Sequence, residues 1–259
     1  MNIIELVNAT VYRGGAIALD NVNLCLPMSE HHAILGANGA GKSTLLKLIT
    51  RDLHPVVKED SVYRVFDQER LTIWDLRSKI GLVSQDFQGG YLALTTGIEV
   101  VLSGLHGSVG LHTHQKITDA QIEQAKAILC ELGIEKLASK QYLQLSTGQQ
   151  RRLILARSLV HKPEVLVLDE PTSGLDLQAK FWFLNCIRRL ARSGTTIILV
   201  THDPLEIIPE ITKVTLLKKG QIQFSGEKQA ALTEKHLSHT FNVDIRVNEE
   251  AGFFHLSPA

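Results

Sequence analysis

The segment from Gly36 to Thr44 carries the residues whose types and spacing are best suited to chemistry. It reads G-A-N-G-A-G-K-S-T and directly follows the apolar run Ala33–Leu35. This pattern is typical of a loop between a strand and a helix that holds the phosphates of a nucleotide. We expect Lys42 to reach the β- and γ-phosphates and the Ser43 hydroxyl to supply one oxygen ligand to Mg²⁺.

Every residue of this loop is a candidate for nucleotide binding. The set is Gly36, Ala37, Asn38, Gly39, Ala40, Gly41, Lys42, Ser43 and Thr44. We expect the three glycines to take positive φ, so that backbone N–H groups approach the phosphate oxygens. Thr44 is expected near the α-phosphate. The alternative is a glycine-rich surface turn, which the flanking strand and helix patterns disfavour.

Two acids end a second apolar run, Val165–Leu168. We expect Asp169 to accept hydrogen bonds from Mg²⁺-bound water, as in other enzymes with such a loop. Glu170 lies one residue further, where it can polarise an attacking water or take its proton as a general base. A polar cap on a strand is the alternative, and the presence of the phosphate loop disfavours it.

The segment L-S-T-G-Q-Q-R-R at 145–152 predicts a second anion site. Ser146 and Thr147 are good helix N-caps, Gly148 allows close approach, and we expect the helix start to present unpaired N–H groups to a ligand. One chain does not need two such sites in series, so this segment is expected to complete the site of another chain. A simple capped helix start is the alternative.

The surrounding pattern predicts elements that position these residues. Residues 3–11 and 22–26 alternate like antiparallel strands, and a hairpin is expected around Lys219-Gly220. Apolar runs predict buried parallel strands, and helical spacing predicts the intervening helices. The expected strands are Ala33–Leu35, Ile80–Ser84, Val165–Leu168, Thr196–Val200, Val214–Leu217 and Ile222–Phe224. The expected helices are Lys42–Thr50, Asp119–Leu132, Thr147–Val160, Leu177–Arg192 and Lys228–His239, followed by a polar tail with two short strands.

The predicted fold class is α/β, a P-loop NTPase core with a parallel sheet, an N-terminal antiparallel β-subdomain and an inserted α-helical subdomain. We expect a single domain over residues 1–259, with the helical subdomain at about 86–160 and a C-terminal extension at about 227–259. Its length is sufficient to bury a sizeable core.

These motifs, in this order, resemble the nucleotide-binding subunit of ATP-binding-cassette (ABC) transporters from about residue 3 to 226. The resemblance rests on the phosphate loop, the L-S-x-G-Q segment, the strand ending in Asp169-Glu170 with P-T-S-G-L-D behind it, and V-T-H-D at 200–203. The sequence departs from the usual pattern at Thr147, where a second glycine is common. Threonine narrows the backbone options there and leaves Ser146 and Gly148 in place.

The resemblance implies further roles, residue by residue. Tyr12 matches the aromatic that stacks on adenine, and Gln85 the glutamine that touches Mg²⁺ and the attacking water and reports to the membrane subunit. Ser146, Gly148 and Gln149 match the signature that closes over the partner's ATP. Asp176 matches the loop that crosses the dimer interface, and His202 the switch histidine at the γ-phosphate. Metal contacts are thus expected from Ser43, Gln85 and Asp169, and catalysis from Lys42, Glu170 and His202.

Composition narrows the partners and the compartment. Lys+Arg and Asp+Glu are 27 each, which gives zero net charge, so nucleic acid is not an expected partner. Cys25, Cys130 and Cys186 are odd in number and far apart, which disfavours disulfides and a zinc site. Because no apolar run reaches the ~20 residues of a membrane span, we expect a cytoplasmic protein that lies on the cytoplasmic face of the membrane through its partner.

The predicted function is hydrolysis of Mg·ATP in a head-to-tail homodimer that drives substrate through a separate transmembrane permease, with a substrate-binding protein as a further partner. The permease is expected to dock near Gln85 and residues 86–118. The tail, Ala231–Leu237 with Asn242–Val247, is similar to importer ATPases for metal chelates and cobalamin, and residues 95–111 resemble a branch labelled as molybdenum transporters.

Two rival functions are disfavoured by features of the sequence. A soluble non-transport cassette ATPase acts on a nucleic-acid, ribosome or protein assembly, and commonly fuses two cassettes or carries basic arms. This chain has one cassette and no charge excess. A P-loop kinase or GTPase gives no reason for the 145–150 segment or for His202.

Overall fold

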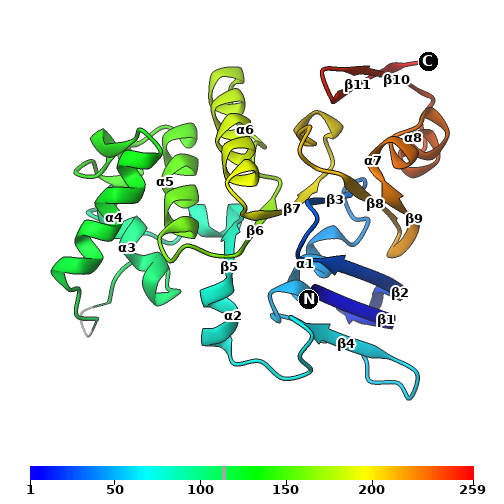
Figure 1. The fold of residues 1–259 in the computed structure, drawn as a ribbon, viewed down its shortest axis with the longest axis horizontal. Coiled ribbons are helices and arrows are strands. Elements are labelled where there is room, and N and C mark those ends of the chain that lie inside the picture. Colours follow the sequence, from blue (N-terminus) through cyan, green and yellow to red (C-terminus); the bar gives the residue numbers. More distant parts are fainter. Residues whose placement is uncertain (113–114) are drawn as a thin grey trace. The chain divides into compact units, whose positions relative to one another are not determined.

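The computed structural model describes residues 1–112 and 115–259, and the remaining two positions fall within the predicted 86–118 segment. The chain forms two compact units (Figure 1). Unit 1 joins Met1–Leu76 to Thr196–Ala259, and unit 2 is Arg77–Thr195. Helix α2 (Ile73–Lys79) spans the boundary between them.

Unit 1 holds a three-stranded antiparallel sheet and strands of a mixed, mainly parallel sheet. The antiparallel sheet has the order β2-β1-β4, made of β1 (Asn2–Arg13), β2 (Ala16–Pro27) and β4 (Val62–Val65). Strand β3 (His32–Leu35) pairs in parallel with both β7 (Thr196–Thr201) and β8 (Lys213–Lys218). Strands β3 and β7 are buried along their whole length, as expected for short apolar strands covered on both faces.

The remaining elements of unit 1 are α1 (Lys42–Ile49), β9 (Gln221–Glu227), α7 (Lys228–Ala231), α8 (Glu234–Phe241), β10 (Ile245–Glu250) and β11 (Phe253–Pro258). Strands β8 and β9 form the hairpin predicted around Lys219-Gly220. The continuous helix predicted over 228–239 is wrong, because Leu232 leaves the helical region and Thr233 caps a new helix by accepting the His236 N–H at 3.3 Å. Strands β10 and β11 pair antiparallel, as the tail pattern indicated.

Unit 2 contains two parallel strands and four complete α-helices in its described part. Strands β5 (Ile80–Val83) and β6 (Val165–Asp169) pair in parallel. The helices are α3 (Gly97–Ser103), α4 (Asp119–Glu131), α5 (Thr147–Leu159) and α6 (Leu177–Arg192). Helix α6 buries one face, and its start at Leu177 and end at Arg192 agree with the prediction. Helices α3, α4 and α5 lie side by side in Figure 1, within the segment predicted to be a helical insert.

Candidate functional site

The phosphate loop follows β3 and opens α1, and its glycines serve two different needs. Gly39 and Gly41 have φ of 79° and 106°, the left-handed region that a side chain disfavours. Positive φ at Gly36 was a wrong expectation. A Cβ on Gly36 would lie 2.3 Å from the Leu217 carbonyl oxygen of β8, so glycine is required there because two backbones approach closely.

Lys42 is held inside this loop. Its side chain is 5% exposed, and Nζ donates to the Gly36 carbonyl at 2.9 Å and to the Ala37 carbonyl at 3.1 Å. Helix α1 begins at Lys42, its N-cap Gly41 provides no side-chain cap, and its first turn contains no acid. N–H groups at an uncapped helix start, beside a buried ammonium, fit the charge and shape of nucleotide phosphates.

Tyr12 is joined to the loop through β2. It pairs with Ile17 close to the turn of the β1–β2 hairpin and is 53% exposed. The next residue of β2, Ala18, packs on the loop, because a Cβ on Gly41 would lie 2.8 Å from the Ala18 carbonyl oxygen. Unit 1 therefore presents an exposed aromatic ring near the phosphate loop, as stacking on adenine requires.

His202 directly follows β7 and is exposed. The preceding Thr201 accepts the Gly36 N–H on its carbonyl at 3.4 Å, which ties this strand end to the start of the phosphate loop. The Thr201 hydroxyl accepts the Asp203 N–H at 2.9 Å and donates to buried Glu206. These bonds fix the backbone on both sides of His202.

The paired acids lie in unit 2, at the carboxyl end of β6. Val165–Leu168 are fully buried and the strand ends at Asp169. Glu170 has φ of 45°, in the left-handed region, and its carbonyl accepts the Ser173 N–H at 3.2 Å. That conformation costs a non-glycine residue on the order of 1–3 kcal/mol, and strain of this kind clusters at functional positions.

The signature segment opens α5 with a capping box. The Ser146 hydroxyl accepts the Gln149 N–H at 3.3 Å, and Gln149 Oε1 accepts the Ser146 N–H at 3.1 Å. The prediction of unpaired N–H groups is therefore wrong for Gln149, since the segment caps itself. Gly148 also has a packing role, because its Cβ would lie 2.9 Å from the Ala179 Cβ of α6.

Two further candidates of unit 2 lie at the starts of helices. Asp176 is the N-cap of α6, and its Oδ1 accepts the Ala179 N–H at 2.7 Å. Gln85 begins the short 3-10 helix Gln85–Gln88 and is exposed. Ser84 caps that helix by accepting the Asp86 N–H at 3.2 Å. These capping roles were not predicted from the sequence, although Ser and Asp are the residue types that provide them.

The candidate residues thus fall into two groups. Tyr12, residues 36–44 and His202 belong to unit 1, and Gln85, the 146–149 segment, Asp169, Glu170 and Asp176 belong to unit 2. Among the described residues no cluster of three or more His, Cys, Asp or Glu forms a metal site. This donor set fits Mg²⁺, which is commonly held by one or two carboxylates together with phosphate oxygens and water.

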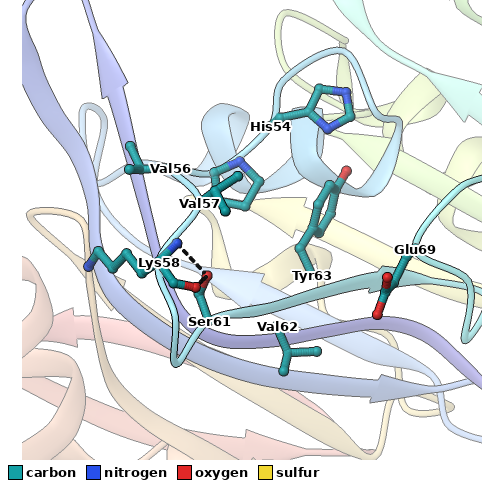
Figure 2. Close-up of a pocket in the computed structure, with 9 residues that line it drawn as sticks. His54, Val56, Val57, Lys58, Ser61, Val62, Tyr63 and Glu69 are labelled. Atoms are coloured by element: carbon teal, nitrogen blue, oxygen red, sulfur yellow. Dashed lines mark hydrogen bonds between the residues drawn. The ribbon is translucent and has the colours of Figure 1, made fainter.

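A hollow of about 300 Å³ lies elsewhere on unit 1, and sequence analysis did not predict it (Figure 2). It is lined by residues of the 54–63 loop and strand together with Glu69. Tyr63 forms one wall and donates its hydroxyl proton to the Leu48 carbonyl at 2.7 Å. No candidate nucleotide-binding residue lines this hollow, so it is not the phosphate site.

A glycine-turned phosphate loop between a buried parallel strand and a helix defines a P-loop nucleotide-binding protein. The model of the ABC transporter domain matches residues 19–173. Two bacterial relatives have similar length. An uncharacterized ABC transporter ATP-binding protein of Bacillus subtilis, YlmA, is 36% identical over 95% of this chain and 93% of its own. The Rhodobacter capsulatus cobalt import ATP-binding protein CbiO is 34% identical over 86% and 78%. The chain therefore belongs to the ABC transporter family, as an ATP-binding subunit.

Solved structures agree with this assignment. A metal-chelate type ABC transporter in an inward-facing conformation gives a TM-score of 0.81 at 25% identity, covering 100% of this chain and 98% of that one. The Clostridium perfringens protein cbiO1, part of the complex cbiONQ, gives 0.75 at 28% identity, covering 92% and 93%. The chain is thus an ATPase of the ABC transporter family. In the described part of the chain, no helix is long and apolar enough to cross a bilayer.

Proposed function

We propose that two copies of this chain bind two Mg·ATP head to tail and hydrolyse them to drive substrate through a separate permease. The observation that carries the proposal is the buried Lys42 ammonium, held on the Gly36 and Ala37 carbonyls at the uncapped start of α1. A cation in that position balances phosphate charge, and the N–H groups around it bind phosphate oxygens.

The other candidate residues are proposed to have the following roles in binding and hydrolysis. Tyr12 stacks on adenine, and Ser43 with Asp169 and Gln85 holds Mg²⁺, directly or through water. Glu170 takes a proton from the attacking water. Its left-handed backbone conformation sets the direction in which the side chain leaves the main chain. His202 and Lys42 stabilise charge on the transferred phosphoryl group, and the partner's signature segment completes the site.

The signature segment is proposed to act in trans. Its capping box holds Ser146 and Gln149 in a fixed geometry at the start of a 13-residue helix. A preorganised helix start of this kind binds a phosphate group with little reorganisation. The dimeric ADP- and phosphate-bound cassette MJ0796, with a TM-score of 0.70 at 28% identity, shows that a similar protein pairs with nucleotide bound.

The permease is proposed to dock beside Gln85, over the segment predicted for this contact. Leu92 and Leu94, which follow Gly89-Gly90, are 78% and 75% exposed. Large apolar side chains exposed this close together favour a protein partner. Through that partner, the chain is proposed to attach peripherally to a membrane.

The proposed substrate class is a metal ion or a metal chelate. The names of several similar proteins refer to cobalt import, manganese transport and metal-chelate transport.

The test uses Ser146→Arg. A bulky cation at the start of α5 blocks the partner's phosphate while leaving the chain's own loop intact, so ATP affinity stays near wild type and hydrolysis is lost. Mixing this variant with Lys42→Ala chains creates pairs with one intact composite site and restores part of the rate. Hydrolysis by Ser146→Arg alone at the wild-type rate under saturating ATP would mean that the segment is only a helix cap.

A further inference from the structure

A buried arginine near the end of α5 contacts the segment that carries Gln85. Arg157 is 5% exposed, and its guanidinium carbon lies 4.4 Å from the centroid of the Phe87 ring. Phe87 is part of the 3-10 helix Gln85–Gln88, two residues after Gln85. A guanidinium over an aromatic face is attractive, and the attraction is stronger where water is excluded.

The same guanidinium also binds the end of α3 and the segment that follows it. Arg157 Nη2 donates to the Ser108 carbonyl at 2.9 Å, and Nε donates to the Ser103 hydroxyl at 3.3 Å. A Cβ on Gly104 would lie 2.2 Å from the Arg157 carbonyl oxygen, so the two backbones touch. One side chain therefore joins three segments, and lysine cannot reproduce its planar fork of donors.

Helix α5 connects this junction to the signature segment. Its 13 residues run from the turn capped by Ser146 to the turn that holds Arg157, a distance of about 17 Å at 1.5 Å per residue. The helix is buried at Arg151 and continuously from Leu153 to Leu159, which packs its second half firmly within unit 2. A displacement at its first turn is thus transmitted to Arg157 and to the ring of Phe87.

We infer that Arg157 is a positioning residue, which ties the Gln85 segment to α5 so that Gln85 and the signature segment move as one body. The inference rests on the proposed role of Gln85 at Mg²⁺ and the attacking water. Arg157 is not proposed to contact the nucleotide. Its loss acts on turnover through Gln85, and ATP affinity, which depends on the phosphate loop of unit 1, stays near wild type.

The same helix supplies a matched control. The Arg152 guanidinium carbon lies 4.4 Å from the centroid of the Trp182 ring, the same distance as in the Arg157 contact, but Trp182 belongs to α6. Arg152→Met and Arg157→Met each remove an arginine–ring contact from this helix, and Arg157→Met also removes the hydrogen bonds to Ser103 and Ser108. Only Arg157→Met frees the segment that carries Gln85, and Phe87→Leu removes the contact from its other side.

Hydrogen exchange on the full-length chain, read by mass spectrometry, tests the contact without reference to activity. The Asp86 and Phe87 amides donate to Ser84 in the segment held by Arg157. We expect about tenfold faster exchange of this segment in Arg157→Met and in Phe87→Leu, and the wild-type rate in Arg152→Met. Wild-type exchange in both test variants, or an equal rise in Arg152→Met, would overturn the inference. If Arg157→Met does not fold, Phe87→Leu decides alone.

A double-mutant cycle with Gln85→Ala tests whether the effect passes through Gln85. We expect Arg157→Met or Phe87→Leu to lower kcat severalfold at unchanged ATP affinity, and to lower it no further in the Gln85→Ala background. Additive losses, as expected for Arg152→Met, would refute the positioning role. Wild-type kcat in Gln85→Ala would instead contradict the proposed role of Gln85, and the exchange experiment would still decide whether Arg157 holds the segment.

Discussion

His32 gives the fold a dependence on pH whose size can be calculated from its surroundings. The side chain is 4% exposed in β3, and Nε2 bonds the Thr215 hydroxyl at 2.8 Å. Burial, and to a lesser extent the charge of Lys213, lowers the pKa of His32 to about 4 in the folded chain. In the unfolded chain the imidazole has its ordinary pKa of about 6.5.

The sign follows from which state binds the proton. Between pH 6.5 and 4 the unfolded chain takes up a proton that the folded chain refuses, so stability falls as the pH is lowered through this window. The loss from His32 alone is about 2 kcal/mol between pH 7 and pH 5, and about 3 kcal/mol once the pH is below the folded value. Above about pH 8 His32 is neutral in both states and contributes no pH dependence.

The assay is urea unfolding of the chain at pH 7 and pH 5, for wild type and for His32→Gln, whose amide keeps a hydrogen-bonding partner for Thr215. Other titrating groups contribute equally to both proteins, so the difference between them isolates His32. We expect the variant to lose about 2 kcal/mol less than wild type between the two pH values. Equal losses would mean that His32 takes up a proton in the folded state without cost, and the reasoning from burial would be refuted.

Three further predictions concern the phosphate loop. Lys42→Ala removes the ammonium held on the Gly36 and Ala37 carbonyls, so isothermal titration should show most of the Mg·ATP affinity gone, and wild-type affinity would argue for a surface turn. Gly36→Ala places a methyl group 2.3 Å from the Leu217 carbonyl oxygen. We expect this clash to lower the free energy of unfolding by about 1–3 kcal/mol and to weaken ATP binding. An unchanged melting midpoint would contradict the close packing at Gly36. Chelation of Mg²⁺ by EDTA should abolish hydrolysis, restored by added Mg²⁺, whereas metal-independent turnover would exclude the proposed metal role.

Contiguous motifs were the most predictable part of this chain. The phosphate loop, the strand before Asp169 and the hairpin at Lys219-Gly220 depend on neighbouring residues, and the structure confirms each element. The reason for Gly36 was not predictable, because its neighbour is the carbonyl of Leu217, far along the chain. The family and its ATPase function were also identified from the motifs, and the comparisons confirm both.

Elements whose boundaries depend on competition between local signals were harder to predict. The break at Leu232 follows from the cap at Thr233, which competes with continuation of the helix. Strand β4 has only four residues, too few to show an alternating pattern, and it was not predicted. The roles of the candidate residues stay predictions. Neighbouring carboxylates such as Asp169 and Glu170 have the same chemistry, and only the bound group that each one contacts, Mg²⁺ or the attacking water, separates their roles.

The arrangement of two chains around ATP is tested most directly by sedimentation of Glu170→Gln with and without Mg·ATP. The amide still orients the water but cannot take its proton, so bound ATP persists and the chains remain paired. We expect a monomer without nucleotide, a dimer with Mg·ATP, and loss of that dimer when Ser146→Arg is added to the same chain. A monomer at saturating Mg·ATP, or a dimer unaffected by Ser146→Arg, would contradict the shared site.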